Sequence, residues 1–234
     1  MKKGRLYLIP TPLGDCPIGE VIPEGVLRTA CSLRTFVVEE LRSARRVLSR
    51  YGLRGHIEEL ELHELNEHSS TEDARALLEL FTRGDVGLLS EAGLPAVADP
   101  GAALVGLCHM EGIEVVPLAG PSSLMMALMA SGLNGQSFAF CGYIPVKAEQ
   151  RKAALRSLEK QSRALSQSQI IIETPYRNDA LLADMLQTLS PGTRICVAAD
   201  ISLPTQTIRT ESVESWRRHP ISIGKRPCVF IILA

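Results

Sequence analysis

The sequence predicts an α/β protein with two α/β domains, an N-terminal one with a mostly parallel sheet and a C-terminal one with a mixed sheet. Three short apolar runs in the first half, at 6–9, 86–89 and 113–116, each end in a loop rich in Gly, Pro and polar residues. Such runs are typical of strands buried on both faces, and their alternation with helical segments predicts a parallel sheet. Later in the chain, strands follow one another with little helix between them, which favours hairpins.

The N-terminal half is expected to alternate strands with amphipathic helices. An apolar stripe at helical spacing predicts a helix over 41–51, and Gly52 is a natural end for it because Gly readily adopts the left-handed conformation. Ser70 ahead of Glu72 is typical of a helix N-terminus and predicts a helix over 70–81. The expected strands are 5–9, 35–38, 86–89 and 113–116, and the other expected helices are 24–33 and 102–110.

The C-terminal half has a different pattern, with more strands in succession. We expect strands at 136–142, 169–173, 194–199, 206–210 and 228–233, and helices at 122–131, 147–160 and 175–189. The basic residues of the helix over 147–160 are interpreted as a solvated face, with a phosphate-contacting patch as the alternative. The pattern changes near 117–121, which predicts one domain over 1–118 and a second over 119–234.

Composition limits the classes of function. A chain with 45% hydrophobic and 22% charged residues is typical of a folded globular enzyme, and a net charge of −1 gives no overall attraction to nucleic acid or anionic membranes. The six cysteines are scattered without a C-x-x-C pair, and the five histidines without an H-x-x-x-H pair, so we expect reduced thiols and no metal site. No apolar stretch is long enough to span a bilayer, so we expect a cytoplasmic protein without membrane contact.

The loops after the apolar runs predict a ligand site. In parallel α/β sheets ligands bind beyond the carboxyl ends of the strands, so three glycine-rich loops at such ends indicate one site built from all three. Neither a G-x-G-x-x-G nor a G-x-x-x-x-G-K-[ST] motif occurs, which argues against a dinucleotide site of the Rossmann type and against a P-loop nucleotidase.

Acidic and polar residues near the expected strand ends are candidates for chemistry. Asp99 suits the N-cap of the next helix, whereas Glu91 has no such structural role and is a candidate ligand-binding carboxylate. The segments 38–42 and 63–67 gather Glu, His and Asn side chains that could position and deprotonate an acceptor hydroxyl. The alternative for both segments is solvated helix ends with local ion pairs.

Seven stretches in register carry a resemblance to a known family. They are LYLIPTPLGD, VVEELR, HELNE, GLLSEAGLPAVADPG, VVPLAGPSS, FCGYIP and ETPYR, and they extend over nearly the whole chain. Together they resemble the tetrapyrrole methylase superfamily of S-adenosylmethionine-dependent methyltransferases. Within it, the chain is similar to the branch that methylates ribose 2′-hydroxyls of small-subunit ribosomal RNA.

The resemblance implies a fold, an assembly and a set of site residues. It implies two α/β domains with the cofactor in an interdomain cleft, a homodimer, and ribosomal RNA or the small ribosomal subunit as partner. The residues that would contact S-adenosylmethionine are Leu13, Glu91, Ala92, Gly93, Ala96, Ser122, Ser123, Glu173 and Ala199. The residues that would line the acceptor side are Glu39, Glu40, Arg42, His63, Asn66 and Glu67, of which Glu39, Glu40 and His63 are candidates for the general base.

Two other functions stay open from the sequence. A tetrapyrrole or another small molecule is the alternative acceptor. A non-catalytic cofactor-binding module is the third possibility, because Asp15, Leu41 and Glu91 stand where the family usually has Asn, Thr and Asp.

Overall fold

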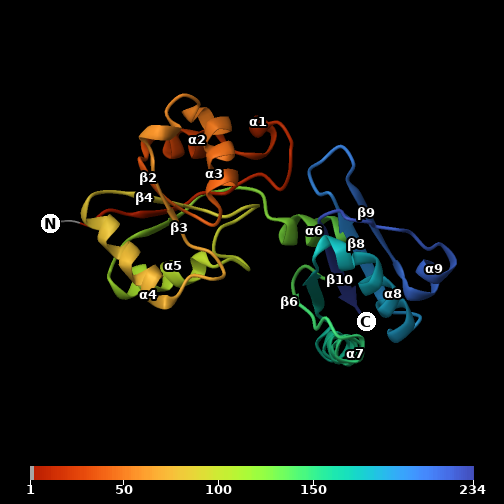
Figure 1. Ribbon diagram of the computed structural model, residues 1–234. Helices are drawn as coiled ribbons and strands as arrows, with labels where there is room; N and C mark the ends of the chain where they lie inside the picture. The colour runs from red at the N-terminus through yellow and green to blue at the C-terminus, as the bar shows by residue number, and fades with distance from the viewer. Residues whose placement is uncertain (1–2) are drawn as a thin grey trace. The chain divides into compact units, whose positions relative to one another are not determined.

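The computed structural model describes residues 3–234, which divide into two compact units (Figure 1). Unit 1 extends to Ser122, and unit 2 begins at Ser123. Each unit contains one five-stranded sheet with helices packed on it, and the two are described separately. The first sheet is parallel and the second is mixed, which confirms the predicted fold class.

The sheet of unit 1 has the strand order β3-β2-β4-β1-β5. Every neighbouring pair is parallel, so the carboxyl ends of all the strands lie at one edge. The apolar β4 (Val86–Leu89) is central and buried along its whole length, as a strand covered on both faces should be. The other strands are β1 (Leu6–Leu8), β2 (Thr35–Val38), β3 (Glu61–Glu64) and β5 (Val115–Pro117).

Helices cover both faces of this sheet (Figure 1). Successive residues of β2 point to opposite faces, so Phe36 and Val38 join the core beneath α2 and α3, while Val37 joins the core beneath α4 and α5. The helices are α1 (Ile18–Val21), α2 (Glu24–Ser32), α3 (Leu41–Leu48), α4 (Thr71–Ala76) and α5 (Gly101–Met110). Shorter helical turns are η1 (Ser49–Leu53), η2 (Ile57–Glu59) and η3 (Leu77–Thr82).

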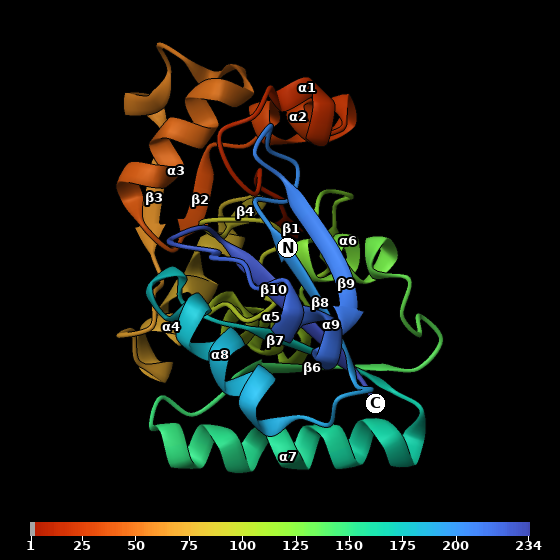
Figure 2. The ribbon, with the colours of Figure 1, turned by 90° about the vertical axis from the view of Figure 1, so that its right-hand side faces the viewer.

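Unit 2 has the strand order β6-β7-β10-β8-β9, in which only β6 and β7 are a parallel pair. The strands are β6 (Phe138–Tyr143), β7 (Ser168–Ile172), β8 (Arg194–Ala199), β9 (Thr207–Ser212) and β10 (Cys228–Leu233). The helices are α6 (Ser123–Ser131), α7 (Ala148–Leu165), α8 (Asn178–Thr188) and α9 (Val213–Arg218), with the turn η4 (Pro175–Arg177) before α8. The long α7 and the neighbouring α8 are clearest in Figure 2.

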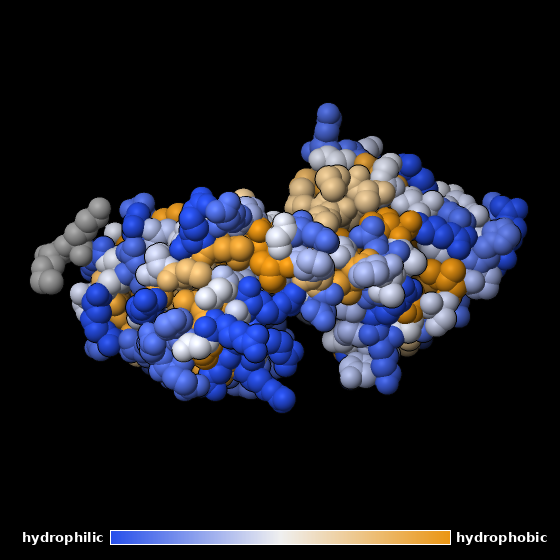
Figure 3. Space-filling view, turned by 90° about the horizontal axis from the view of Figure 1, so that it is seen from above, coloured by the Kyte–Doolittle hydropathy of each residue, from blue (hydrophilic) through white to orange (hydrophobic). Residues whose placement is uncertain are grey.

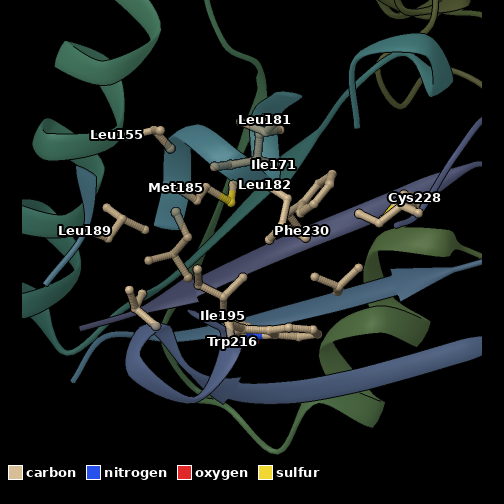
Figure 4. Close-up of a cluster of buried hydrophobic side chains, with 14 of the residues drawn as sticks. Leu155, Ile171, Leu181, Leu182, Met185, Leu189, Ile195, Trp216, Cys228 and Phe230 are labelled. Atoms are coloured by element: carbon tan, nitrogen blue, oxygen red, sulfur yellow. The ribbon is translucent and has the colours of Figure 1, made fainter. Parts of the chain in front are cut away.

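The core of unit 2 gathers side chains from three helices around the sheet (Figure 4). Leu155 of α7, Met185 of α8 and Trp216 of α9 are completely buried there, together with Phe230 of the central strand. The indole Nε1 of Trp216 donates a hydrogen bond to the carbonyl of Ile195, 3.0 Å away, so its one polar atom is satisfied. This packing fixes the ends of β7 and β8.

Several predicted elements differ from the observed ones in length or type. The helix expected over 41–51 leaves α-geometry after Leu48, and Gly52 has a φ of 117° inside the following turn. The helix expected over 70–81 is α4 followed by the 3₁₀ turn η3, and Ser70 makes the capping box at its start. Within residues 3–234, no helix is both long and apolar enough to cross a membrane.

Candidate active site at the carboxyl edge of the first sheet

The loops that follow β1 and β4 are hydrogen-bonded to each other. The amide of Thr11 donates to the carbonyl of Gly93 at 2.8 Å, and the amide of Gly93 donates to the carbonyl of Thr11 at 3.1 Å. The two strands are neighbours in the sheet, and their loops therefore leave the same edge side by side. This pairing holds Leu13 and Gly93, both predicted ligand contacts, in one place.

Gly93 has no side chain where the chain is most crowded. Its φ is +80°, and a Cβ added there would lie 3.2 Å from Cδ2 of Leu13 and 3.6 Å from the carbonyl oxygen of Pro121. Gly120, in the same loop as Pro121, lies directly against Pro10, where an added Cβ would be 2.2 Å from the ring. The loops after β1, β4 and β5 thus meet at the edge of the sheet.

A hollow of about 360 Å³ opens between these loops and α3. One wall is the β1 loop and another is the start of the β4 loop, including Glu91 and Ala92. The third wall is one face of α3 and the following turn: Ser43, Arg46, Val47 and Arg50. Sequence reasoning missed this third wall, although these positions have the spacing of one helical face immediately after the acidic segment 38–42.

Glu39 follows β2 and turns toward the β4 loop. Its Oε2 accepts a hydrogen bond from the amide of Glu91 at 3.2 Å. Burial raises the pKa of the Glu39 carboxyl, and the nearby carboxyls of Asp99 and Glu91 raise it further, against the opposing effect of the Glu91 amide. Glu39 is therefore a half-buried carboxyl with an elevated pKa beside the mouth of the β4 loop.

Glu40, its neighbour, serves as the N-cap of α3. Its carboxylate accepts hydrogen bonds from the amides of Arg42 at 2.7 Å and Ser43 at 2.6 Å. These two amides lower the pKa of Glu40, since they favour its charged form. Adjacent carboxyls that look equivalent in sequence thus have opposite environments.

Replacing Glu40 with Gln should make the protein less stable at neutral pH than at acid pH, relative to wild type. A carboxyl whose pKa is depressed by folding stabilises the native state above its unfolded pKa, and that stabilisation is lost as the pH falls through the folded pKa. The difference in melting temperature between wild type and E40Q, measured from pH 7 down to pH 3, should therefore shrink with falling pH. A constant difference would contradict the capping role.

The polar side chains after β2's outer neighbour, β3, interact locally. His63 lies within β3, and its Nε2 is 3.0 Å from Oε1 of Glu61. The side-chain oxygen of Asn66 accepts from the amide of His68 at 2.9 Å, and Glu67 is paired with His68 at 3.6 Å. None of these residues lines the hollow beside α3.

Asp99 holds the β4 loop in shape. Its Oδ1 accepts from the amides of Ala96 at 3.1 Å and Gly101 at 2.7 Å. The predicted N-cap was wrong by one residue, because α5 begins at Gly101 and Pro100 stands at the N-cap position. Ala96 has a φ of +65°, a conformation unusual for a residue with a side chain, which is a form of strain common at functional sites.

In unit 2, Glu173 stands directly after β7 with its side chain completely buried. Its Oε1 accepts from Nε of Arg177 at 2.9 Å and from the amide of Thr174 at 2.7 Å. Its Oε2 is buried without a hydrogen-bond partner. Ala199 ends β8 and is buried, and Ser122 and Ser123 lie at the start of α6. A buried orphan acceptor in a native fold calls for a donor.

Among residues 3–234, no group of three His, Cys, Asp or Glu side chains could hold a metal ion. The cysteines of that range are all free. Burial raises the pKa of the Cys228 thiol to about 12 and that of the Cys108 thiol to about 11. These thiols are core residues.

Comparison with known proteins agrees with the sequence resemblance. The family model described as Tetrapyrrole (Corrin/Porphyrin) Methylases matches residues 20–216. A Vibrio cholerae protein named ribosomal RNA small subunit methyltransferase I is 33% identical over 205 residues, 87% of this chain and 67% of its own length. The protein of the same name from Pseudomonas aeruginosa is 30% identical over 236 residues, 99% of this chain and 79% of its own.

Solved structures of low sequence identity share the fold. Diphthine synthase superposes with a TM-score of 0.70 at 17% identity, over 99% of this chain and 90% of its own. The methyltransferase CobJ gives a TM-score of 0.65 at 17% identity, over 98% of this chain and 94% of its own. By family model, by relatives and by fold, the chain belongs to the tetrapyrrole methylase family of S-adenosylmethionine-dependent methyltransferases.

Proposed function

We propose that this enzyme transfers the methyl group of S-adenosylmethionine to a ribose 2′-hydroxyl of small-subunit ribosomal RNA. The names of relatives with 30–33% identity over most of the chain support the acceptor. The observation that carries the proposal is the hollow between the hydrogen-bonded β1 and β4 loops, with the elevated-pKa carboxyl of Glu39 beside the second loop. A methyltransferase needs a donor site and a proton acceptor close together.

The cofactor contacts proposed from the sequence have features that suit such a ligand. Gly93 leaves room for a ligand to approach the backbone, and the buried Oε2 of Glu173 lacks a donor that an ammonium or hydroxyl group would supply. S-adenosylmethionine supplies an electrophilic methyl group on a sulfonium. We propose that it contacts residues of both units: Leu13, Glu91, Ala92, Gly93, Ala96, Ser122, Ser123, Glu173 and Ala199.

Glu39 is the proposed general base. A carboxyl is a better base when its pKa lies closer to the working pH, and burial together with Asp99 and Glu91 moves the pKa of Glu39 in that direction. It would accept the proton of the attacking hydroxyl while the methyl group moves in line from sulfur to oxygen. Glu40 would act indirectly, by capping the helix whose face lines the hollow. His63 stays a second candidate for contact with the acceptor nucleotide.

We extend the proposal to a cytoplasmic homodimer. Phe138, Phe140 and Tyr143 are exposed on β6, an edge strand of the sheet of unit 2, and Met129 is exposed on α6. Exposed apolar groups, some visible as tan and orange areas of unit 2 in Figure 3, are typical of contact surfaces. Analytical ultracentrifugation should show a dimer that F138S/F140S converts to a monomer. A wild-type monomer at micromolar concentration would contradict it.

The proposed acceptor is tested with small ribosomal subunits purified from a strain that lacks the gene. With methyl-labelled S-adenosylmethionine, the enzyme should label the ribosomal RNA, and alkaline hydrolysis should leave the label in a dinucleotide, because a 2′-O-methyl group blocks cleavage at that ribose. Subunits from the parent strain are the control and should accept little label. Label in a base, in a free tetrapyrrole, or nowhere would contradict the proposed acceptor.

A further inference from the structure

The surface of α3 and the turn after it carries an unusual charge. Five arginines occur between Glu40 and Glu58, with no acidic residue among them, although the whole chain has a net charge of −1. All five side chains are exposed: Arg42, Arg45, Arg46, Arg50 and Arg54. We call this set the arginine face. Strongly hydrophilic side chains, drawn in blue, are prominent on unit 1 in Figure 3.

The arginine face lacks the internal partners that neutralise other cations of the protein. Arg45 and Arg46 make no hydrogen bond or ion pair with any residue in the described range 3–234. Their position in the last turn of α3 suits the helix dipole, but that interaction stabilises by only about 0.3–1 kcal/mol per charge and leaves the guanidinium in water. The concentration of positive charge therefore exceeds what the fold requires.

The basic helix α7, which the sequence singled out, is the opposite case. Arg151 is buried and bonded to Asp184, and Nζ of Lys152 is 3.7 Å from the same carboxylate. Arg163 is 3.9 Å from Glu159. The charges of α7 are thus largely neutralised within unit 2, which favours the solvated, structural interpretation of that helix.

Geometry connects the arginine face to the candidate active site. Arg46 and Arg50 belong both to this face and to the wall of the hollow, opposite Glu91 and Ala92. Arg50 is fixed at that rim, because it donates to the carbonyl of Cys16 and lies 3.5 Å from Asp15. A phosphodiester chain lying along α3 would present one of its nucleotides to the hollow.

We infer that the arginine face binds the phosphate backbone of the RNA substrate and positions the target nucleotide at the hollow. The inference rests on the proposed function and adds the surface that recognises the substrate. Guanidinium groups bind phosphate oxygens in a planar, often bidentate geometry, and each such contact releases counterions from the RNA. The local charge, and not the net charge of the chain, supplies the attraction.

The test is R45Q/R46Q, assayed with small ribosomal subunits from the strain lacking the gene. The KM for subunits should rise roughly tenfold while kcat stays within about twofold, because ground-state contacts are removed away from the reacting atoms. At about 0.7 of a unit of log-salt slope per phosphate contact, the weakening on going from 50 to 200 mM salt should be about sevenfold smaller than in wild type. R45K/R46K, which keeps both charges, should recover most of the affinity.

R156Q/K160Q is the matched control, since it also removes two exposed positive charges, from α7 of unit 2. Its KM and salt dependence should equal those of wild type. An R45Q/R46Q enzyme with unchanged KM and salt slope would overturn the inference while the proposed function stands. Loss of S-adenosylhomocysteine binding in that variant would also overturn it, because the face would then belong to the cofactor site. Failure of the wild type to methylate the subunits would instead reject the proposed function itself.

Discussion

Replacing Glu39 with Gln should lower kcat by a factor of about 10²–10⁴, the usual contribution of a positioned general base. Gln keeps the shape and the hydrogen bond from the Glu91 amide but cannot accept the proton of a hydroxyl. In wild type, kcat should rise with pH as Glu39 ionises, and this limb should vanish in E39Q. Methyl-transfer rates measured from pH 4.5 to pH 8 test both expectations.

Stability should change in the opposite direction from activity. Folding raises the pKa of Glu39, so the native state binds its proton more tightly than the unfolded chain does. The carboxyl therefore does not oppose folding below its ordinary pKa of 4.5, and it becomes increasingly unfavourable as the pH rises through the elevated value. E39Q should consequently melt at a higher temperature than wild type at pH 7, and the gain should disappear near pH 4. E58Q, at an exposed position without a partner, is the control and should change neither rate nor stability. A less stable E39Q with wild-type kcat would show that Glu39 is only structural.

Replacing Gly93 with Val should weaken binding of S-adenosylhomocysteine on the order of a hundredfold, since a strain of about 1–3 kcal/mol corresponds to up to two powers of ten. The added Cβ would lie 3.2 Å from Leu13 Cδ2, at a φ of +80° that a β-branched residue strongly disfavours. The loop would have to shift, and the hydrogen bonds between Thr11 and Gly93 would be lost with it. Calorimetric titration of both proteins measures the difference.

Gly106→Ala is the control for this variant. Gly106 lies within α5, where an added Cβ would meet no atom within 4 Å. Alanine is favoured over glycine inside a helix by roughly 0.5–1 kcal/mol, so G106A should be at least as stable as wild type and bind the ligand equally well. Equal affinity in G93V and wild type would mean that the β1 and β4 loops do not form the cofactor site.

The elements that sequence predicted best are those with a single periodic signal. The strand expected over 228–233 is β10 with the same bounds, because a continuous apolar run fits only a fully buried central strand. The strand β3 was missed because Glu61, His63 and Glu64 give it a polar appearance, which suits the edge of a sheet. The helix α9 was missed because the six residues after Ser212 show too little periodicity to be detected.

The site was predicted unevenly for a related reason. The loops around Leu13 and Gly93 were found because glycine and proline report backbone geometry directly in the sequence. The different environments of Glu39 and Glu40 were not predictable, because they depend on which carboxyl caps α3 and which faces Asp99. The role of Arg46 and Arg50 was hidden as well, since the wall they form depends on how α3 packs against the loops.

The central claim is that the paired loops after β1 and β4 bind S-adenosylmethionine. Hydrogen exchange on the wild-type protein, with and without saturating S-adenosylhomocysteine, tests it most directly. We expect slower exchange in the peptides covering 11–15 and 91–96, and no change in the peptide covering η2. Unchanged exchange in both loops, together with no heat of binding at millimolar ligand, would contradict the claim.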